Sequence, residues 1–156
     1  MSKEEKPNKL EGIEMTNRLE DVKINVKIKL LALWAAVMFI YLYVDVFGFF
    51  EPGIIEEIIA GEVAGIQINQ VFLLGALILM IIPSLMVFLS LALPAKVNRW
   101  VNIIVGIFYI VVVLGFLIGE SYAFYIFGSI VEAVLLGLIV WYAWKWPTQE
   151  IKPKSG

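Results

Sequence analysis

The chain has 156 residues, of which 61% are hydrophobic and only 17% are charged, and its formal net charge is −2 at pH 7. A soluble domain of this length carries more polar surface, so the composition indicates a membrane protein and excludes most soluble classes. The chain contains no cysteine and no histidine, which excludes disulfides, thiolate nucleophiles, cysteine-ligated metals and Ser-His-Asp triads. We therefore expect no cofactor and no bound metal ion.

Four segments are long and apolar enough to cross a membrane. An α-helix rises about 1.5 Å per residue, so roughly 30 Å of hydrocarbon takes about 20 residues. The segments lie at about 30–50, 71–93, 100–119 and 122–144. Because open strands cannot span a bilayer, we predict an all-α fold, a polytopic four-transmembrane-helix bundle. The membrane domain would cover residues 22–148, between an N-terminal tail at 1–21 and a C-terminal tail at 149–156.

The basic residues predict how the bundle is oriented. They lie before the first span, between the second and third spans, and after the fourth. The charged residues of the other two connections are all acidic. Cytoplasmic segments retain Lys and Arg, so we expect both termini in the cytoplasm. The N-terminal tail mixes both signs of charge, which argues against a nucleic-acid partner.

Residues 22–29, just before the first span, alternate between apolar and polar side chains. In a soluble protein this pattern would suggest a β-strand. Next to a span, we expect it to start the helix instead. Asn17 and Glu20 would cap that helix, with Lys27 and Lys29 reaching the lipid headgroups.

The connection between the first two spans predicts a short amphipathic helix on the outer membrane interface. Its isoleucines recur at i, i+1, i+4 and i+5, as Ile54, Ile55, Ile58 and Ile59. Glu56 and Glu57 lie on the other side, and Gly61 would end the helix. Two roles stay open for it, a lid that packs on the bundle and a gate or substrate entrance.

Glu132 is the ionisable residue placed deepest in a span. It lies about ten residues, or about 15 Å, from the outer end of the fourth span, where a charge costs about 2.5–3.5 kcal/mol to insert. Tyr41 and Tyr109 come out at a similar depth, and Pro83 and Ser84 lie slightly further in. Because proline removes one backbone hydrogen bond and kinks a helix, we expect a small polar cavity here.

Helical periodicity adds two residues to this layer. Asp45 shares a stripe with Tyr41 on the first span, and Ser129 shares a face with Tyr125 and Glu132 on the fourth. Asp45 is either an interfacial group or part of an outward-facing site. The candidate ligand-binding or proton-binding residues are therefore Glu132, Tyr109, Tyr41, Ser84, Asp45 and Ser129, and we assign no catalytic residue.

Two interpretations of Glu132 stay open. Every Lys and Arg lies roughly 15 Å away at the inner interface. We therefore expect Glu132 to be protonated and hydrogen-bonded when no ligand is bound. A structural Glu132 would tie helices together through Tyr or Ser. A functional Glu132 would exchange a proton, bind a cation, or hold the polar head of an apolar ligand.

Small residues suggest either helix packing inside the chain or a dimer seam. They form a ridge on the fourth span at Ser129, Ala133 and Gly137, and a shorter pair at Gly115 and Gly119.

Several short strings carry a resemblance to a known family. They are KIKL at 27–30 with LWA at 33–35, PSLM at 83–86 with FLS at 88–90, NRW at 98–100 with NII at 102–104, AFYIF at 123–127, and IVWYAW at 139–144. Over roughly residues 19–148 the chain resembles an uncharacterised family of small four-helix prokaryotic integral membrane proteins, distantly similar to the DoxX-like group. This resemblance implies a four-helix bundle in a prokaryotic inner membrane. Some DoxX-like members associate with quinone-linked redox partners.

Three functions stay open. The first is a carrier for a small molecule, a cation or a coupled proton, with Glu132 as the binding acid and a homodimer as the working form. The second is an accessory subunit that binds a lipid or quinone without turnover. An enzyme ranks last, because the chain offers no paired membrane carboxylates at evident close depth, metal cluster or phosphate loop. Expected partners are membrane lipids, a hydrophobic or cationic small molecule, and a second copy of the chain.

Overall fold

The computed structural model describes residues 22–147, which form five helices and one small hairpin. The elements are α1 (Val26–Gly48), α2 (Ile54–Ala60), β1 (Glu62–Val63), β2 (Ile66–Gln67), α3 (Gln70–Ala92), α4 (Ala95–Phe116) and α5 (Ala123–Trp144). Four of them, α1, α3, α4 and α5, are long and apolar enough to cross a membrane. The predicted all-α class with four spanning helices is confirmed.

Each predicted span coincides with a helix, and the largest differences are at helix starts. α1 begins at Val26, where the Asn25 side chain accepts a hydrogen bond of 2.9 Å from the backbone N–H of Lys27. Residues 22–25 are not helical, but α1 begins inside the segment 22–29, which therefore starts a helix and not a strand. The capping residues proposed for this helix lie outside the described residues. α4 begins at Ala95, directly after Pro94.

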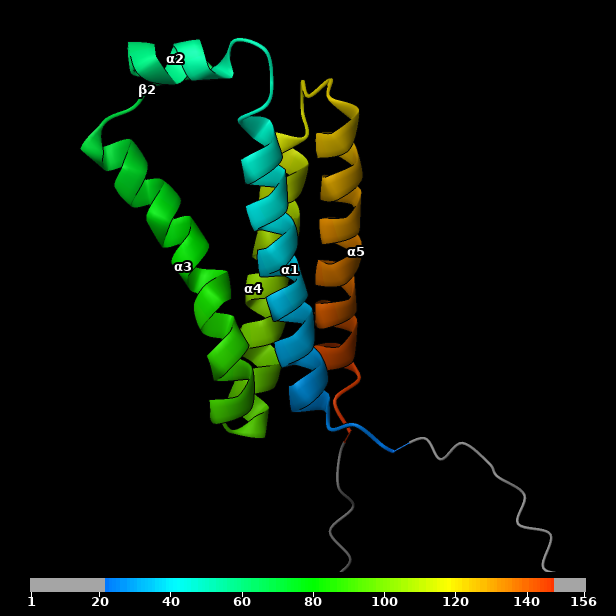
Figure 1. Cartoon of the computed structure of the whole chain (residues 1–156). Helices are drawn as coiled ribbons and strands as arrows, with labels where there is room; N and C mark the ends of the chain where they lie inside the picture. The colour runs from blue at the N-terminus through cyan, green and yellow to red at the C-terminus, as the bar shows by residue number, and fades with distance from the viewer. Residues whose placement is uncertain (1–21, 148–156) are drawn as a thin grey trace, which may run out of the picture.

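Helix α5 packs along both α1 and α4, whereas α3 packs mainly on α1 (Figure 1). Two glycines allow the close approach. A Cβ on Gly106 would lie 2.8 Å from Val140 Cγ2 of α5, and a Cβ on Gly128 would lie 2.5 Å from Val44 Cγ2 of α1. The small residues proposed for packing behave differently, because a Cβ on Gly115, Gly119 or Gly137 would have no neighbour within 4 Å among the described residues.

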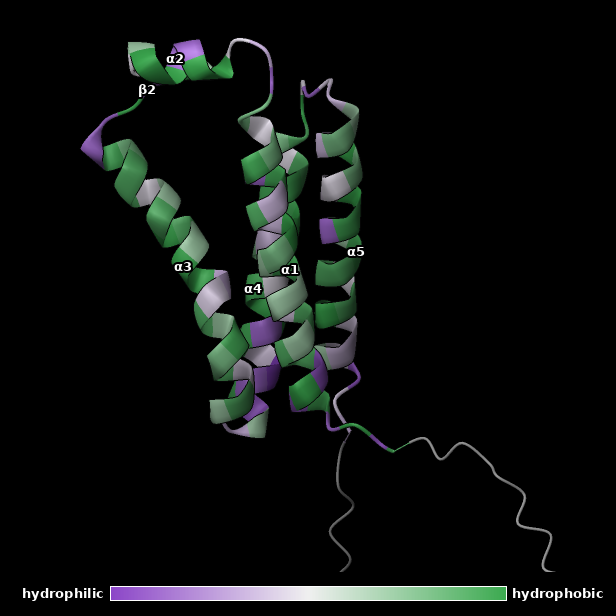
Figure 2. Ribbon diagram, in the orientation of Figure 1, coloured by the Kyte–Doolittle hydropathy of each residue, from purple (hydrophilic) through white to green (hydrophobic). Residues whose placement is uncertain are grey.

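The two ends of the bundle differ in charge. The start of α1, the connection from α3 to α4 and the end of α5 lie together at what we call the basic end (Figure 2). Every Lys and Arg among residues 22–147 lies there: Lys23, Lys27, Lys29, Lys96, Arg99 and Lys145. We call the opposite end, which carries α2, the hairpin, Glu51 and Glu120, the acidic end.

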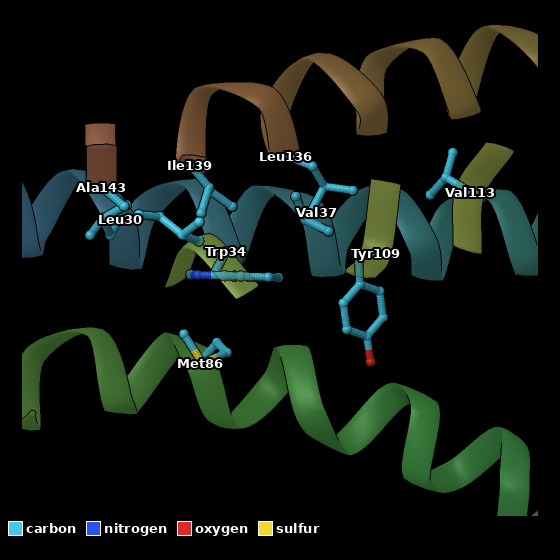
Figure 3. Close-up of a cluster of buried hydrophobic side chains, with 10 residues drawn as sticks. Leu30, Trp34, Val37, Met86, Tyr109, Val113, Leu136, Ile139 and Ala143 are labelled. Carbon is cyan, nitrogen blue, oxygen red and sulfur yellow. The ribbon is translucent and has the colours of Figure 1, made fainter. Parts of the chain in front are cut away.

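A buried polar network holds α1, α3 and α4 together near the basic end. Trp34 Nε1 of α1 donates to Asn102 Oδ1 of α4 at 2.7 Å, and Asn102 Nδ2 donates to Asn98 Oδ1 at 2.6 Å. Asn98 Nδ2 donates in turn to the backbone carbonyl of Ser90 on α3 at 2.6 Å. All four residues are fully buried, beside the apolar cluster of Leu30, Val37, Met86 and Ile139 (Figure 3).

Lys27 completes the attachment of α3 at this end. Its Nζ donates to the carbonyls of Leu91 at 3.0 Å and Leu93 at 2.7 Å. The last carbonyls of a helix have no partner within the helix and attract cations. Lys27 therefore caps α3 from α1, and its contact with headgroups stays a prediction.

Pro83 divides α3 into two segments. Proline has no backbone N–H, so the carbonyl of Leu79, four residues earlier, has no partner within the helix. The Tyr109 hydroxyl of α4 donates to that carbonyl, and Figure 3 shows this side chain extending toward α3. The buried residues of α3 are Pro83, Met86 and Ser90. We call residues 83–92 the packed segment and residues 70–82, none of which is buried, the free segment.

The connection between α1 and α3 contains the predicted short helix, α2. It lies between Gly53 and Gly61, whose φ values of 90° and 83° only glycine adopts readily. The hairpin that follows was not expected, since strands of two residues leave no periodicity. Its turn residues Ala64 and Gly65 both have positive φ, 50° and 74°, which is the geometry of a type I′ turn.

The polar network predicts a large effect of Asn102→Ala on stability. The substitution leaves the buried Trp34 N–H and Asn98 amide oxygen without a partner, so we expect the free energy of unfolding to fall by about 2 kcal/mol. Thermal unfolding in detergent, followed by circular dichroism, measures it. Lys96→Ala, an exposed change at the same end, is the control and should unfold like the wild type. Equal midpoints for Asn102→Ala and Lys96→Ala would contradict the network.

A double-mutant cycle tests the bond between Tyr109 and the Leu79 carbonyl. In the wild-type background, Tyr109→Phe leaves that carbonyl unpaired, so the substitution should destabilise the protein by about 1 kcal/mol. In a Pro83→Ala background the N–H of residue 83 serves the carbonyl, and the same substitution should cost much less. Strictly additive unfolding free energies would show that the hydroxyl does not replace the missing N–H.

Candidate functional site

A cavity of about 790 Å³ lies between the free segment of α3 and the helices α1, α4 and α5. It exists because α3 leaves the other helices beyond Pro83 toward the acidic end (Figure 1). Small side chains on α3 leave room for it, since Gly75 and Ala76 both line the cavity. The volume falls within the usual range for a drug-sized or cofactor-sized ligand.

The cavity has one polar wall and one apolar wall. The polar wall comes from α1 and α5 and contains Tyr41, Asp45, Tyr125, Ser129 and Glu132. The apolar wall comes from the free segment of α3 and from α4, with residues such as Phe72, Leu79, Val113 and Phe116. Gln67 of the hairpin and Asn69, which caps α3, border the cavity toward the acidic end. Such a lining suits an amphiphilic molecule.

Glu132 is almost completely buried, with 4% of its surface exposed. It lies one turn from Ser129 and two turns from Tyr125 on the same face of α5. Among the side-chain hydrogen bonds within residues 22–147, none involves its carboxyl group, so the expected bond to a Tyr or Ser is not present. Asp45 brings a second carboxyl group, and the residues that line the cavity include no Lys or Arg.

The two tyrosines at the deep part of the cavity differ in what their hydroxyl groups do. The ring centroids of Tyr41 and Tyr109 lie 6.4 Å apart. The Tyr109 hydroxyl is engaged with the Leu79 carbonyl. The Tyr41 hydroxyl is buried and has no hydrogen-bond partner within the described part of the chain. An unsatisfied buried hydroxyl costs about 1–3 kcal/mol, so this wall retains unused polar capacity.

The structure brings together five of the six predicted site residues. Glu132, Tyr109, Tyr41, Asp45 and Ser129 all line the cavity. Asp45 is also exposed, so both interpretations of this residue stay open. Ser84 does not line it. Its Oγ donates to the Met80 carbonyl at 2.7 Å and lies 3.6 Å from Met38 Sδ, so its polar group is satisfied next to the proline.

Three polar lining residues were absent from the prediction. Tyr125 shares the face of Glu132, a periodicity that could have included it. Gln67 and Asn69 belong to the hairpin and the cap that follows it. No sequence signal placed these two beside a membrane helix, because the hairpin itself was not expected.

The acidic end adds negative charge near the cavity. Partial burial and the nearby Glu120 raise the pKa of Glu51 above its ordinary value. Glu120 itself accepts hydrogen bonds from the backbone N–H groups of Ser121 and Tyr122 at 2.7 and 2.9 Å. Clustered acids of this kind raise the local concentration of cations. Within the described residues there is no group of three or more potential metal ligands.

The comparisons with known proteins agree with the resemblance to an uncharacterised family. A family of unknown function (DUF6326) matches residues 19–152, which include all four spanning helices and the cavity. No curated protein and no solved structure matches the chain. Since the match covers most of its length, the chain belongs to this family of unknown function.

Proposed function

We propose that the protein is a membrane carrier that binds a lipophilic cation in the cavity, with Glu132 as the binding acid. One observation carries this proposal. The cavity places two carboxyl groups, from Asp45 and Glu132, opposite an apolar wall, and its lining contains no basic residue.

The chemistry of the two walls supports this substrate class. A buried carboxylate needs a compensating charge, and a bound cation supplies it where the protein has none. The apolar wall removes the hydrophobic body of the ligand from water, and aromatic rings such as Tyr41 and Tyr109 add cation–π attraction. When no cation is bound, a proton on Glu132 keeps this carboxyl group neutral. Exchange of that proton for the cation would couple the two movements.

The proposal includes an orientation. All described Lys and Arg residues lie at the basic end, which the positive-inside rule assigns to the cytoplasm. The cavity would then open toward the outside, with both termini in the cytoplasm of a prokaryotic cell. The working form would be a homodimer, because one four-helix bundle offers little protein surface against which to alternate access.

A second candidate function is an accessory subunit that holds a neutral lipid or a quinone without moving it. The apolar wall favours this alternative. This alternative requires both carboxyl groups to stay uncharged while the ligand is bound. The Tyr41 hydroxyl would contribute only a hydrogen bond to the ligand.

Substitution of Glu132 separates these candidates. With tetraphenylphosphonium as the probe, we expect Glu132→Gln to weaken binding at least tenfold, about 1.4 kcal/mol, because it removes the negative charge. Equilibrium dialysis of the detergent-purified protein measures the affinity, and uptake into proteoliposomes tests transport.

Ser84→Ala, outside the lining, serves as the control and should bind like the wild type. Unchanged probe affinity in Glu132→Gln, together with a co-purifying neutral lipid or quinone, would support the accessory subunit instead.

Filling the cavity tests its location. A Cβ at Gly75 or at Gly115 meets no atom within 4 Å, yet only Gly75 lines the cavity. We expect Gly75→Leu to abolish measurable probe binding without loss of thermal stability, since leucine favours a helix over glycine by about 0.5–1 kcal/mol. Gly115→Leu makes the same change outside the cavity and should bind normally. The cavity is not the binding site if both variants keep wild-type affinity.

A further inference from the structure

We propose that residues 70–82, the free segment of α3, form a movable wall of the cavity. The wall is hinged at Pro83 and latched to α4 by the hydrogen bond from Tyr109 to the Leu79 carbonyl. The role of this wall in ligand binding rests on the proposed function, whereas the movement of the wall does not.

The packed segment supplies the fixed side of the hinge. Its last turn is held by Asn98, which donates to the Ser90 carbonyl at 2.6 Å, and by Lys27, which donates to the carbonyls of Leu91 and Leu93 at 3.0 and 2.7 Å. Met86 and Ser90 are also fully buried against the other helices. Movement of this segment would break the bonds that Asn98 and Lys27 donate to its carbonyls, so it stays in place.

The free segment has no comparable attachment. None of its residues is buried, only Leu79 and Ile82 among them pack against the apolar core, and α3 as a whole has little contact with α4. Figure 1 shows it diverging from α4 and α5 toward the acidic end. Its one side-chain hydrogen bond to another helix, among the described residues, is the bond that the Leu79 carbonyl accepts from Tyr109.

Pro83 makes the junction between the segments easy to bend. In a regular helix, the bond from residue 83 to the carbonyl of residue 79 would resist opening of that turn. Here that carbonyl is served by a side chain from another helix. A change in the Tyr109 side chain therefore frees the turn, and Tyr109 also lines the cavity. Tyr109 is therefore a positioning residue: a ligand that contacts its side chain in the cavity would change the bend of α3 at Pro83.

Closure of the wall would bury the apolar side chains that now face the cavity, such as Val71, Phe72 and Leu79. The ligand would then lie between these residues and the carboxyl groups of α1 and α5. An open wall with no ligand and a closed wall around a lipophilic cation are the two states that follow, as in other proteins whose hinged elements close over a bound molecule.

Spin-label distances test the hinge directly, since the chain has no native cysteine. One label pair joins Leu74 of the free segment to Phe127 of α5, and a control pair joins Phe88 of the packed segment to Leu138 of α5. All four side chains are exposed and line no part of the cavity. In the ligand-free protein we expect a broader distance distribution for the first pair than for the control pair.

Two substitutions sharpen the test. Tyr109→Phe should broaden or shift the Leu74–Phe127 distribution and leave the Phe88–Leu138 distribution unchanged. Pro83→Ala should narrow the first distribution, because the restored N–H stiffens the turn. Equally narrow distributions for both pairs, or a Leu74–Phe127 distribution that Tyr109→Phe does not alter, would overturn the hinge. If Tyr109→Phe unfolds the protein, the distance distributions of both label pairs will broaden. The narrowing expected for the Leu74–Phe127 distribution in Pro83→Ala then decides the result.

Addition of tetraphenylphosphonium separates this inference from the proposed function. We expect the probe to move the Leu74–Phe127 distance to a single shorter value. Absence of probe binding in dialysis overturns the proposed function and leaves the ligand-free comparison to decide the hinge. Probe binding with no change in the Leu74–Phe127 distance overturns the movable wall and leaves the proposed function intact.

Discussion

A backbone carbonyl buried in a membrane protein must find a hydrogen-bond donor, and in this chain one such carbonyl determines how the site is built. Pro83 removes the donor that would serve the Leu79 carbonyl. The hydroxyl of Tyr109 takes its place, which ties α3 to α4 at the depth where α3 begins to diverge. A water molecule would satisfy the carbonyl equally well, but it would carry no mechanical connection between two helices.

The rest of the arrangement follows from a difference in how the two halves of α3 are held. In hydrocarbon, lipid tails cover apolar helix surface as well as another helix does, so polar contacts and close packing decide which helices associate. The packed segment has both, through Ser90, Asn98 and Lys27. The free segment has only the bond from Tyr109 to the Leu79 carbonyl and the packing of Leu79 and Ile82 against the core, and its other apolar side chains gain little by packing on α4. The cavity persists for this reason, since hydrophobic attraction alone does not collapse it.

Much of this fold could be predicted from residue spacing, and the reasons for the exceptions are physical. Span length and helix rise located all four long helices, and the same rise brought Tyr41, Tyr109 and Glu132 to one depth. Depth does not say in which direction a side chain points around its helix, so Ser84 was assigned to a cavity that it does not line. The Trp34–Asn102 bond joins residues 68 positions apart, and nothing in either local sequence pairs them. The hairpin depends on positive φ at Ala64 and Gly65, a turn preference too short to show as a pattern.

The position of the two acids indicates what the proposed movable wall would contribute to binding. Glu132 and Asp45 come from α5 and α1, which are packed tightly against each other through Gly128, so the polar wall stays rigid. In the proposed carrier, a rigid polar wall would keep its geometry for recognition of a cation, because electrostatic attraction depends strongly on distance in a medium of low dielectric constant. Apolar contacts tolerate variation in shape, and many of them are supplied by the free segment of α3, which has no buried residue. The rigid polar wall therefore suits electrostatic contacts, which require a fixed distance. The loosely held apolar wall suits hydrophobic contacts, which do not.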